Sequence, residues 1–304
     1  MRHYFIINPA AGRQSSEKTI IELLNTHKID ASVYLTKNPG DATKYIKSVC
    51  KKEPDTLKRF WACGGDGTLN EVVNGIMGFK NTELACYPCG SGNDYVKYFG
   101  DIDSFFDMEK QLNGKPMLVD VLEVGGRYAI NEINFGFDSV AAYVMQKIKR
   151  KPFIGGKNAY MTGVMYALIN AMDNPCKVFS GDELLNPTGR ILLCTAMCGQ
   201  YIGGGFRCAP NSSLDDGLID VTIIKPLLRR KLLSLMKKYK DGSYLKAPEL
   251  QKYIIYRQLD KIRFEAHKGF SITMDGENVQ MPEGEIRLIH KAVKFIVPNG
   301  QEEV

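Results

Sequence analysis

A glycine-rich segment at residues 64–75, GGDGTLNEVVNG, has the residue types of a phosphate-binding loop. It follows the apolar run Phe60–Cys63 and continues into a helix pattern with four apolar residues on one face: Leu69, Val72, Val73 and Ile76. A helix N-terminus offers unpaired N–H groups and the positive end of the helix dipole, so an anion is stabilised there. Asp66 would be an anion beside phosphates, which predicts a cation between them, and magnesium is the natural candidate.

The start of this helix also has the spacing of a capping box, with Thr68 followed three residues later by Glu71. On its own, GGDG is equally typical of a glycine turn capped by an aspartate in an α/β protein. The rest of the chain must therefore separate the two interpretations.

Two further turns occupy equivalent places after strand candidates. PCGSGNDY, residues 88–95, follows Leu84–Tyr87, and the turn Asn8–Arg13 follows Tyr4–Ile7 and precedes a helix with Ser15 or Ser16 as candidate cap. The carboxyl ends of parallel strands meet at one edge of a sheet, so we expect the three loops to form one site. Neither G-x-G-x-x-G nor G-x-x-x-x-G-K-[ST] occurs, which counts against a dinucleotide fingerprint and a Walker loop.

The elements that position these loops alternate in type over the first 120 residues. Strands are predicted at Tyr4–Ile7, Ala31–Leu35, Arg59–Cys63 and Leu84–Tyr87, and helices at Ser15–Thr26, Asp41–Lys52 and Thr68–Ile76. This alternation predicts a parallel sheet with helices on both faces.

From about residue 117 strands dominate, which predicts a β-sandwich or barrel-like second domain. The strand candidates are Leu118–Val124, Arg127–Asn131, Arg190–Met197, Ile219–Ile224, Lys261–Ala266, Ser271–Met274, Glu285–Ile289 and Val293–Val297. Two helices, Val140–Arg150 and Ala159–Met172, interrupt them.

Composition limits the class of protein. The chain of 304 residues is 44% hydrophobic, enough for one large or two medium domains, and has no apolar run long enough to cross a membrane. Its eight cysteines are expected to be reduced thiols in a cytoplasmic protein, and the lone CxxC of Cys86 and Cys89 favours ordinary thiols over a zinc or redox site.

The net charge of +6 resides partly in two basic runs, which are either solvated helix faces or a surface for a membrane or nucleic acid. The first comprises Lys147, Lys149, Arg150, Lys151 and Lys157, and the second Arg229, Arg230, Lys231, Lys237, Lys238 and Lys240.

Five motifs together resemble the diacylglycerol kinase catalytic-domain family, specifically its soluble bacterial lipid kinases. They are NPAAGR at 8–13, GGDGTLNEVVNG at 64–75, PCGSGNDY at 88–95, DGLIDV at 216–221 and MDGE at 274–277. The resemblance implies an N-terminal three-layer α/β nucleotide-binding domain, residues 1–122 with a returning segment at about 293–304. It also implies a C-terminal β-sandwich domain for the lipid substrate, residues 123–292, with ATP in the cleft.

The resemblance also implies the site residues. ATP would be bound by Asn8, Pro9, Ala10, Ala11, Gly12, Thr36, Gly64, Gly65, Asp66, Gly67, Thr68, Leu69, Asn70, Ser91 and Asn93. A second magnesium would be held by Ser213, Asp216 and the carbonyl of Leu218, and this site is expected to be weak because several relatives have Asp at the position of Ser213.

Three other carboxylates have open roles. Either Asp275 or Glu277 would receive the proton of the acceptor hydroxyl as general base. Asp120 matches an acidic residue near the metal network of the family, or is an exposed charge on a strand. Without the resemblance, Asp215-Asp216-Gly217 is a good turn before a strand, and Asp275-Gly276-Glu277 is a turn at a strand end.

The resemblance implies an ATP-dependent lipid kinase that phosphorylates a hydroxyl of diacylglycerol or a similar lipid to give a phosphatidic-acid-like product. Such an enzyme must bind peripherally at the inner face of the membrane; nucleic acid is not expected as a partner, and a homodimer is left open. One alternative is NAD kinase, which shares the GGDGT loop but lacks the GSGND loop in this form. The other is a non-catalytic nucleotide or lipid sensor, which would be expected to have lost at least one of the motifs.

Overall fold

The first part of the chain is a parallel sheet, as the alternation of strands and helices predicts. The computed structural model describes residues 1–12, 16–148 and 157–300. Four strands pair in parallel in the order β2-β1-β3-β4: β1 (Arg2–Ile7), β2 (Ala31–Leu35), β3 (Lys58–Gly64) and β4 (Thr82–Pro88). The helices between them are α1 (Ser16–Thr26), α2 (Asp41–Lys52) and α3 (Asp66–Ile76). Ser15, a candidate cap of α1, lies outside the described residues.

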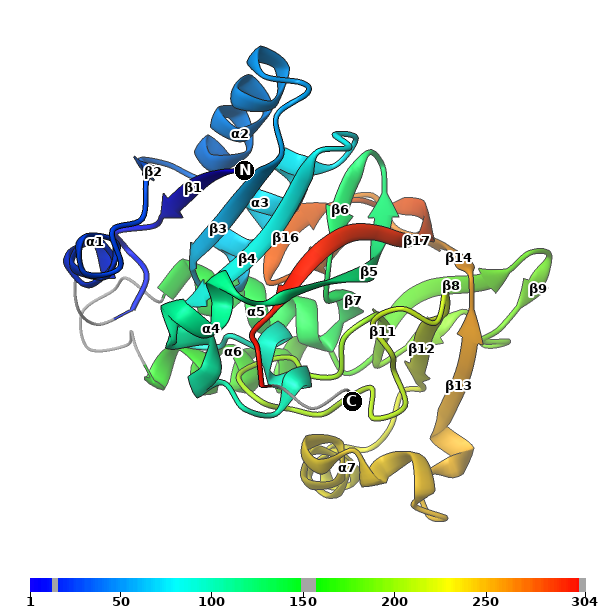
Figure 1. Cartoon of the computed structure of the whole chain (residues 1–304). Helices are drawn as coiled ribbons and strands as arrows, with labels where there is room; N and C mark the ends of the chain where they lie inside the picture. Colours follow the sequence, from blue (N-terminus) through cyan, green and yellow to red (C-terminus); the bar gives the residue numbers. More distant parts are fainter. Residues whose placement is uncertain (13–15, 149–156, 301–304) are drawn as a thin grey trace.

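Helices cover both faces of this sheet, which confirms the three-layer α/β architecture (Figure 1). On one face, Ile46 of α2 and Val72 of α3 pack against Phe60 of β3 in a fully buried core. On the other face, Ile20 of α1 and Met108 of α4 (Met108–Leu112) belong to the core around Trp61. Side chains that alternate along β3 therefore enter two separate cores.

The predicted capping box at the start of α3 is wrong. The helix begins at Asp66 with Gly65 as its N-cap residue, and no side chain caps that position. The Thr68 hydroxyl instead accepts a hydrogen bond from Asn8 Nδ2 at 3.3 Å. The Glu71 carboxylate accepts from the backbone N–H groups of Gly40 and Ala42, at 2.9 and 3.1 Å, and so serves the start of the neighbouring helix α2.

Removing this carboxylate is expected to weaken α2. We expect Glu71→Ala to lower the free energy of unfolding by about 1–2 kcal/mol, the usual cost of losing a helix cap. Urea unfolding would measure the change. Glu71→Gln keeps an acceptor oxygen and should recover part of the loss; equal midpoints for Glu71→Ala and the unmodified protein would contradict the assignment.

The second part of the chain is a β-sandwich. One layer continues the first sheet through β5 (Lys115–Val124), β6 (Arg127–Ala129), β8 (Asn174–Ser180), β9 (Glu183–Leu184), β10 (Arg190–Ile191), β14 (Lys261–Ala266) and β17 (Glu283–Val297). The other layer contains β7 (Glu132–Gly136), β11 (Leu193–Met197), β12 (Ile219–Ile224), β13 (Ile254–Leu259), β15 (Ser271–Met274) and β16 (Glu277–Gln280). Phe135 of β7 and Phe264 of β14 meet in the core between the layers, with ring centroids 5.0 Å apart.

A single long strand joins the two parts. The first half of β17 pairs with β14, and near its end Phe295 pairs in parallel with Leu84 of β4 and packs in the core of the first part. The sheet therefore runs without a break from one part to the other (Figure 1). The domain boundaries at residues 122 and 292 stay predictions, because no break in the sheet marks them.

Three helices cover the outer face of the second layer. Two of them, α5 (Phe137–Ile148) and α6 (Lys157–Asn170), are the predicted helices, and their ends differ by two or three residues from the prediction. Lys149, Arg150 and Lys151 of the first basic run lie outside the described residues. The third, α7 (Arg229–Asp241), contains the second basic run, and its Leu232 and Leu235 are buried in the core beneath it. None of the described helices is long and apolar enough to cross a membrane.

Candidate active site

The three glycine-rich loops lie side by side at the carboxyl ends of β1, β3 and β4, as predicted. The backbone N–H of Cys89 donates to the Gly64 carbonyl at 2.8 Å. A Cβ atom at Gly12 would lie 2.6 Å from the Cys89 carbonyl oxygen, and one at Gly90 would lie 2.4 Å from the Cα of Gly65. Real Cβ atoms do not approach that closely, so these contacts require glycine.

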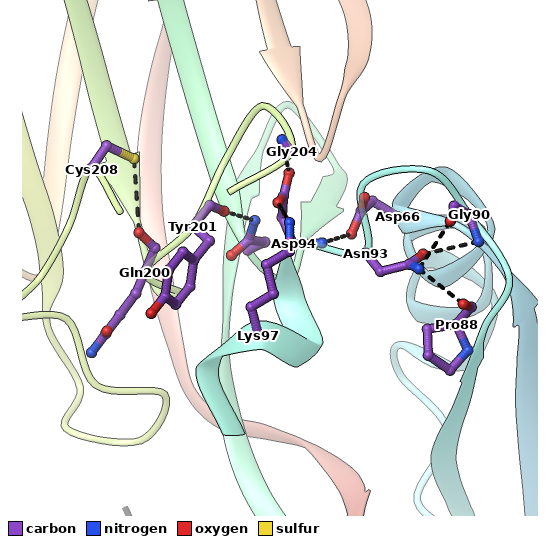
Figure 2. A network of polar contacts seen from close by, with 11 residues as sticks. Asp66, Pro88, Gly90, Asn93, Asp94, Lys97, Gln200, Tyr201, Gly204 and Cys208 are labelled. Carbon is purple, nitrogen blue, oxygen red and sulfur yellow. Dashed lines mark hydrogen bonds and ion pairs between the residues drawn. The ribbon is translucent and has the colours of Figure 1, made fainter. Parts of the chain in front are cut away.

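Polar side chains in the first and third loops hold the loops themselves in shape. Asn8 Oδ1 accepts from the N–H of Ala10 at 3.0 Å, while Nδ2 of the same side chain reaches Thr68. Asn93 has the left-handed φ of 51° that asparagine tolerates. Its side-chain oxygen accepts a hydrogen bond from the Gly90 N–H at 3.0 Å, and its Nδ2 donates to the carbonyls of Pro88 and Gly90 at 2.9 and 3.0 Å (Figure 2). These hydrogen bonds fix the shape of the first and third loops.

Among the other predicted nucleotide-binding residues, Ser91 is exposed in the third loop. Thr36 follows β2 at the same edge of the sheet, where its N–H donates to the Ile7 carbonyl at 2.9 Å. Leu69 differs, because it is only 2% exposed and packs in the hydrophobic core, so its side chain is not part of a nucleotide surface.

Asp66 lies at the centre of the site and is linked to a second carboxylate, Asp94. The N–H of Asp94 donates to Asp66 Oδ1 at 2.8 Å. The Asp94 side chain pairs with Lys97 Nζ at 2.5 Å and accepts from the N–H of Gly204 at 2.8 Å (Figure 2). Gly204 belongs to a loop of the second domain, so Asp94 connects the two domains beside Asp66. The site prediction omitted Asp94, although it belongs to the GSGND motif.

Burial and, to a smaller extent, the negative charges of Asp94 and Asp275 together raise the pKa of the Asp66 carboxyl to about 6. An ionised carboxylate in such surroundings is stabilised by a cation. Carboxylate and phosphate oxygens are the ligands that Mg²⁺ prefers. The residues present therefore fit magnesium bound between Asp66 and a phosphate group.

Asp275 and Glu277, the two candidate bases, have different surroundings. Asp275 and Gly276 form the two-residue turn between β15 and β16, with φ values of 44° and 85°. The Asp275 side chain is buried and accepts four hydrogen bonds. One oxygen accepts from Asn70 Nδ2 and Ile130 N–H, at 2.9 and 2.8 Å, and the other from the N–H groups of Asn131 and Glu132, at 3.0 and 2.9 Å.

This arrangement makes Asp275 the anchor of its turn. Burial raises the pKa of the Asp275 carboxyl, while the four donors favour its charged form. Asn70, predicted to bind the nucleotide, uses its side-chain amide to bond Asp275 and the Tyr128 carbonyl, and thereby ties α3 to the second domain.

Glu277, by contrast, is exposed and reaches across to the phosphate-binding loop. Its Oε1 lies 3.1 Å from the position that a Cβ atom at Gly67 would occupy. A carboxylate of the β-sandwich domain therefore faces the loop of the α/β domain in which a phosphate would bind. The absence of a side chain at Gly67 leaves room for this approach.

The DG turn at residues 216–217 is organised by Asp120. The Asp120 side chain is fully buried, so the interpretation as an exposed strand charge is wrong. It accepts from the N–H groups of Gly217 and Lys291, at 2.8 and 2.7 Å, and pairs with His290 Nδ1 at 2.9 Å.

The predicted second magnesium site lies beside this turn. Ser213 Oγ donates to Asp215 at 3.1 Å, and the exposed Asp216 accepts from the N–H of Leu218 at 3.0 Å. Within the part of the chain that the structure describes, no three His, Cys, Asp or Glu residues are grouped as metal ligands. The predicted set thus contains one carboxylate, a hydroxyl and a carbonyl, a weak combination for Mg²⁺.

We expect Ser213→Asp to strengthen magnesium binding at this turn by about tenfold, because a second carboxylate adds charge and a hard oxygen ligand. Calorimetric titration of the unmodified protein and the variant with Mg²⁺ would measure the change. Ser213→Asn, which adds an oxygen without charge, is the control. Tight binding of a fully coordinated ion by the unmodified protein would contradict the prediction.

Comparison with known proteins identifies two domain families along the chain. The sequence model of the diacylglycerol kinase catalytic domain matches residues 2–124, and that of the YegS C-terminal NAD kinase beta sandwich-like domain matches residues 131–297. The chain is 27% identical over 308 residues to "Diacylglycerol kinase" of Bacillus subtilis, covering 99% of this chain and 98% of that one. It is 26% identical over 294 residues to "Probable lipid kinase YegS-like" of Alcanivorax borkumensis, covering 95% and 94%.

Solved structures share the fold. A diacylglycerol kinase from Bacillus anthracis superposes with a TM-score of 0.69 at 20% identity, over 99% of this chain and 98% of that one. A further crystal structure from the same organism gives a TM-score of 0.74 at 23% identity, over 99% and 97%.

Proposed function

Since the chain belongs to the diacylglycerol kinase catalytic-domain family, we propose that this lipid kinase transfers the γ-phosphoryl group of ATP to a hydroxyl of diacylglycerol or a closely similar lipid. The product would be phosphatidic acid or its analogue. The observation that carries the proposal is the approach of Glu277, from the β-sandwich, to Gly67 of the phosphate-binding loop. Phosphoryl transfer depends mainly on positioning and charge neutralisation. This contact brings the loop that would bind the phosphates of ATP close to the domain that would bind the lipid hydroxyl.

The three loops and Asp66 bind the nucleotide in this proposal. The backbone N–H groups at the start of α3 and in the flanking glycine loops face the phosphates, where the helix dipole stabilises negative charge. Asp66 would hold magnesium against the phosphate oxygens, and the ion would neutralise the charge that develops on them. Asp94 orients Asp66 through its backbone N–H while its side chain holds the Gly204 loop over the site.

We assign the acceptor hydroxyl to the space beside Glu277. A general base needs an accessible lone pair, and the four acceptor positions of the Asp275 carboxylate are filled by protein donors. Glu277, which is exposed and whose Oε1 faces Gly67, would receive the proton. Asp275 is then a positioning residue that fixes the turn from which Glu277 projects. The acceptor lipid must be reached at a bilayer, so we place the enzyme at the inner face of the membrane as a peripheral protein.

Labelled ATP with a panel of acceptors tests this function. Incubation with diacylglycerol, monoacylglycerol, sphingosine and NAD in the presence of magnesium should give labelled phosphatidic acid as the main product. Robust labelling of NAD with no lipid product would replace the proposal with NAD kinase. Saturable ATP binding without transfer to any acceptor would identify a sensor.

A further inference from the structure

A hollow of about 450 Å³ opens on the second domain, and its lining is strongly cationic. It lies between the segment after α6, strand β10 and the residues on either side of the β12–β13 connection. Arg190, Lys225 and Lys252 line it, together with Tyr253 and one carboxylate, Asp173. None of these residues belongs to the glycine-rich loops or to the turn at Asp275. The hollow is therefore separate from the proposed catalytic site.

Carboxylates of the described residues neutralise only part of this positive charge. Arg190 pairs with Asp173 at 2.7 Å, and both side chains are about half exposed. Lys225 Nζ donates at 3.2 Å to the Lys252 carbonyl, a neutral acceptor that does not compensate the charge of the ammonium group. The ammonium groups of Lys231 and Lys252 lie 5.0 and 5.2 Å from the centre of the Tyr253 ring.

Lys231 therefore adds a fourth cation to the rim. A hydrogen bond from Lys231 and the charges of Lys231 and Lys252 hold the pKa of the Tyr253 phenol below its usual range. Four cations and one carboxylate leave an excess of positive charge around an open hollow. Such an arrangement suits an anionic ligand, and a phosphate group in particular.

Exposed apolar side chains lie on α6, the helix that ends three residues before Asp173 of the hollow. Met161, Met165 and Ile169 recur every four residues along α6 and form one exposed row, in which Ile169 is 68% exposed. Leu228, just before α7, is 59% exposed. Large apolar side chains exposed together on a soluble protein mark a surface that binds something.

Arg229 joins the end of the apolar row to the start of α7. Its Nε donates to the Leu168 carbonyl at 2.8 Å, and its guanidinium also reaches the Ile169 carbonyl at 3.4 Å. This clamp fixes the start of α7 against the end of α6. The row therefore ends beside Leu228, and the chain then passes through Asp173 into the lining of the hollow.

We propose that the row and the hollow together form a lipid-docking surface for bilayers that contain anionic phospholipids. The row, Met161, Met165, Ile169 and Leu228, would insert among the acyl chains. The hollow, with Arg190, Lys225, Lys231 and Lys252, would bind the phosphate of a lipid headgroup. Free phosphate would fill the hollow but leave the apolar row in water, whereas a bilayer satisfies both, as at other interfacial sites. The inference rests on the proposed function, which requires a lipid substrate, but it can be tested separately.

Vesicle sedimentation provides the test. Unmodified protein is mixed with vesicles of phosphatidylcholine, or of equimolar phosphatidylcholine and phosphatidylglycerol, at low and high salt. The hollow variant carries Lys225→Gln, Lys231→Gln and Lys252→Gln, and the row variant carries Met161→Ser, Met165→Ser and Ile169→Ser. The control removes equal charge from exposed positions of α2 in the first domain, with Lys44→Gln, Lys47→Gln and Lys51→Gln.

We expect the hollow variant to bind the phosphatidylglycerol vesicles about 100-fold more weakly, at about fivefold per charge removed, and to lose most of the salt response. The row variant should bind weakly to both kinds of vesicle, and the α2 control should bind like the unmodified protein. Equal binding by the hollow variant and the control would overturn the proposal. Binding of inorganic phosphate to the hollow, with vesicle binding unaffected in both variants, would also overturn it.

Kinase activity on a monomeric short-chain diacylglycerol separates the two proposals. The hollow and row variants should retain it, because neither changes a residue of the catalytic site. If the unmodified protein phosphorylates no lipid but its vesicle binding depends on the hollow, the docking surface stands and the proposed function fails. If it phosphorylates the short-chain lipid but both variants bind vesicles as well as the unmodified protein does, the proposed function stands and the docking surface fails.

Discussion

Replacing Asp66 by Asn is expected to abolish phosphoryl transfer, with kcat lowered by about 10³-fold or more. Asn keeps the shape of the side chain and one acceptor oxygen for the N–H of Asp94, which lies 2.8 Å from Asp66 Oδ1. It removes the charge that would hold magnesium against the phosphates. ATP turnover and transfer to lipid should therefore be lost while the loops keep their structure.

The same substitution is expected to stabilise the protein. The pKa of Asp66 is raised to about 6, so the native state holds a proton more tightly than the unfolded chain. The free energy of unfolding therefore falls as pH rises from about 4 to about 6, and above that range the buried carboxylate costs about 1–3 kcal/mol. Asn does not ionise and avoids this cost, so activity and stability change in opposite directions.

Thermal unfolding across pH, in the absence of magnesium and nucleotide, would measure this effect. Asp66→Asn should unfold at a higher temperature than the unmodified protein at pH 7, and the difference should vanish toward pH 4. Asp55→Asn, at an exposed loop position, is the matched control and should change neither activity nor stability. Turnover by Asp66→Asn at the unmodified rate, with magnesium as the only metal, would remove Asp66 from the mechanism.

The loops and most elements of the first domain were predictable because local signals agree there. Apolar runs, helix periodicity and glycine turns point to the same strands and helices, and parallel pairing then brings Gly12, Gly65 and Gly90 together. The capping prediction failed because tertiary structure gave Glu71 another partner. Its carboxylate bonds the start of α2, residues that a local pattern cannot associate with it.

Some strands of the second domain were not predicted because buried polar residues interrupt the expected hydrophobic pattern. Strand β7 reads Glu132-Ile-Asn-Phe-Gly, and all five of its residues are buried, so its sequence shows neither an exposed face nor a fully apolar run. Glu132 and Asn134 bond each other, and burial raises the pKa of Glu132 well above its usual range. Only the three-dimensional pairing of β7 with β11 and β15 reveals why these residues lie in a strand.

The matched substitutions Asp275→Asn and Glu277→Gln are expected to separate anchoring from catalysis. Asn offers one acceptor oxygen in place of two, so two of the four donors around Asp275 lose their partner. Each buried donor left without an acceptor costs about 1–3 kcal/mol, so Asp275→Asn should lower the free energy of unfolding by about 2–6 kcal/mol. Backbone strain adds nothing, because asparagine tolerates the φ of 44° at this position.

Glu277→Gln should have the opposite profile. Glu277 is exposed, so its replacement should change the free energy of unfolding by less than about 0.5 kcal/mol. Loss of a general base should lower kcat by about 10²–10⁴-fold and remove the rise in kcat with pH that reports the ionisation of that base. The KM for ATP should stay unchanged, because the nucleotide loops are untouched.

Urea unfolding and pH–rate profiles of both variants distinguish the two carboxylates. A fully folded Asp275→Asn protein that has lost both its activity and the acidic limb of its pH profile would return the role of base to Asp275, provided that Glu277→Gln turns over normally. The geometry favours the other outcome. Asp275 is surrounded by Asn70, Ile130, Asn131 and Glu132, all of which donate to it, whereas Glu277 extends from the same turn to Gly67, where the phosphoryl group would arrive. The same hairpin turn would thus supply Asp275, which holds the turn in place, and Glu277, whose carboxylate faces the phosphate-binding loop.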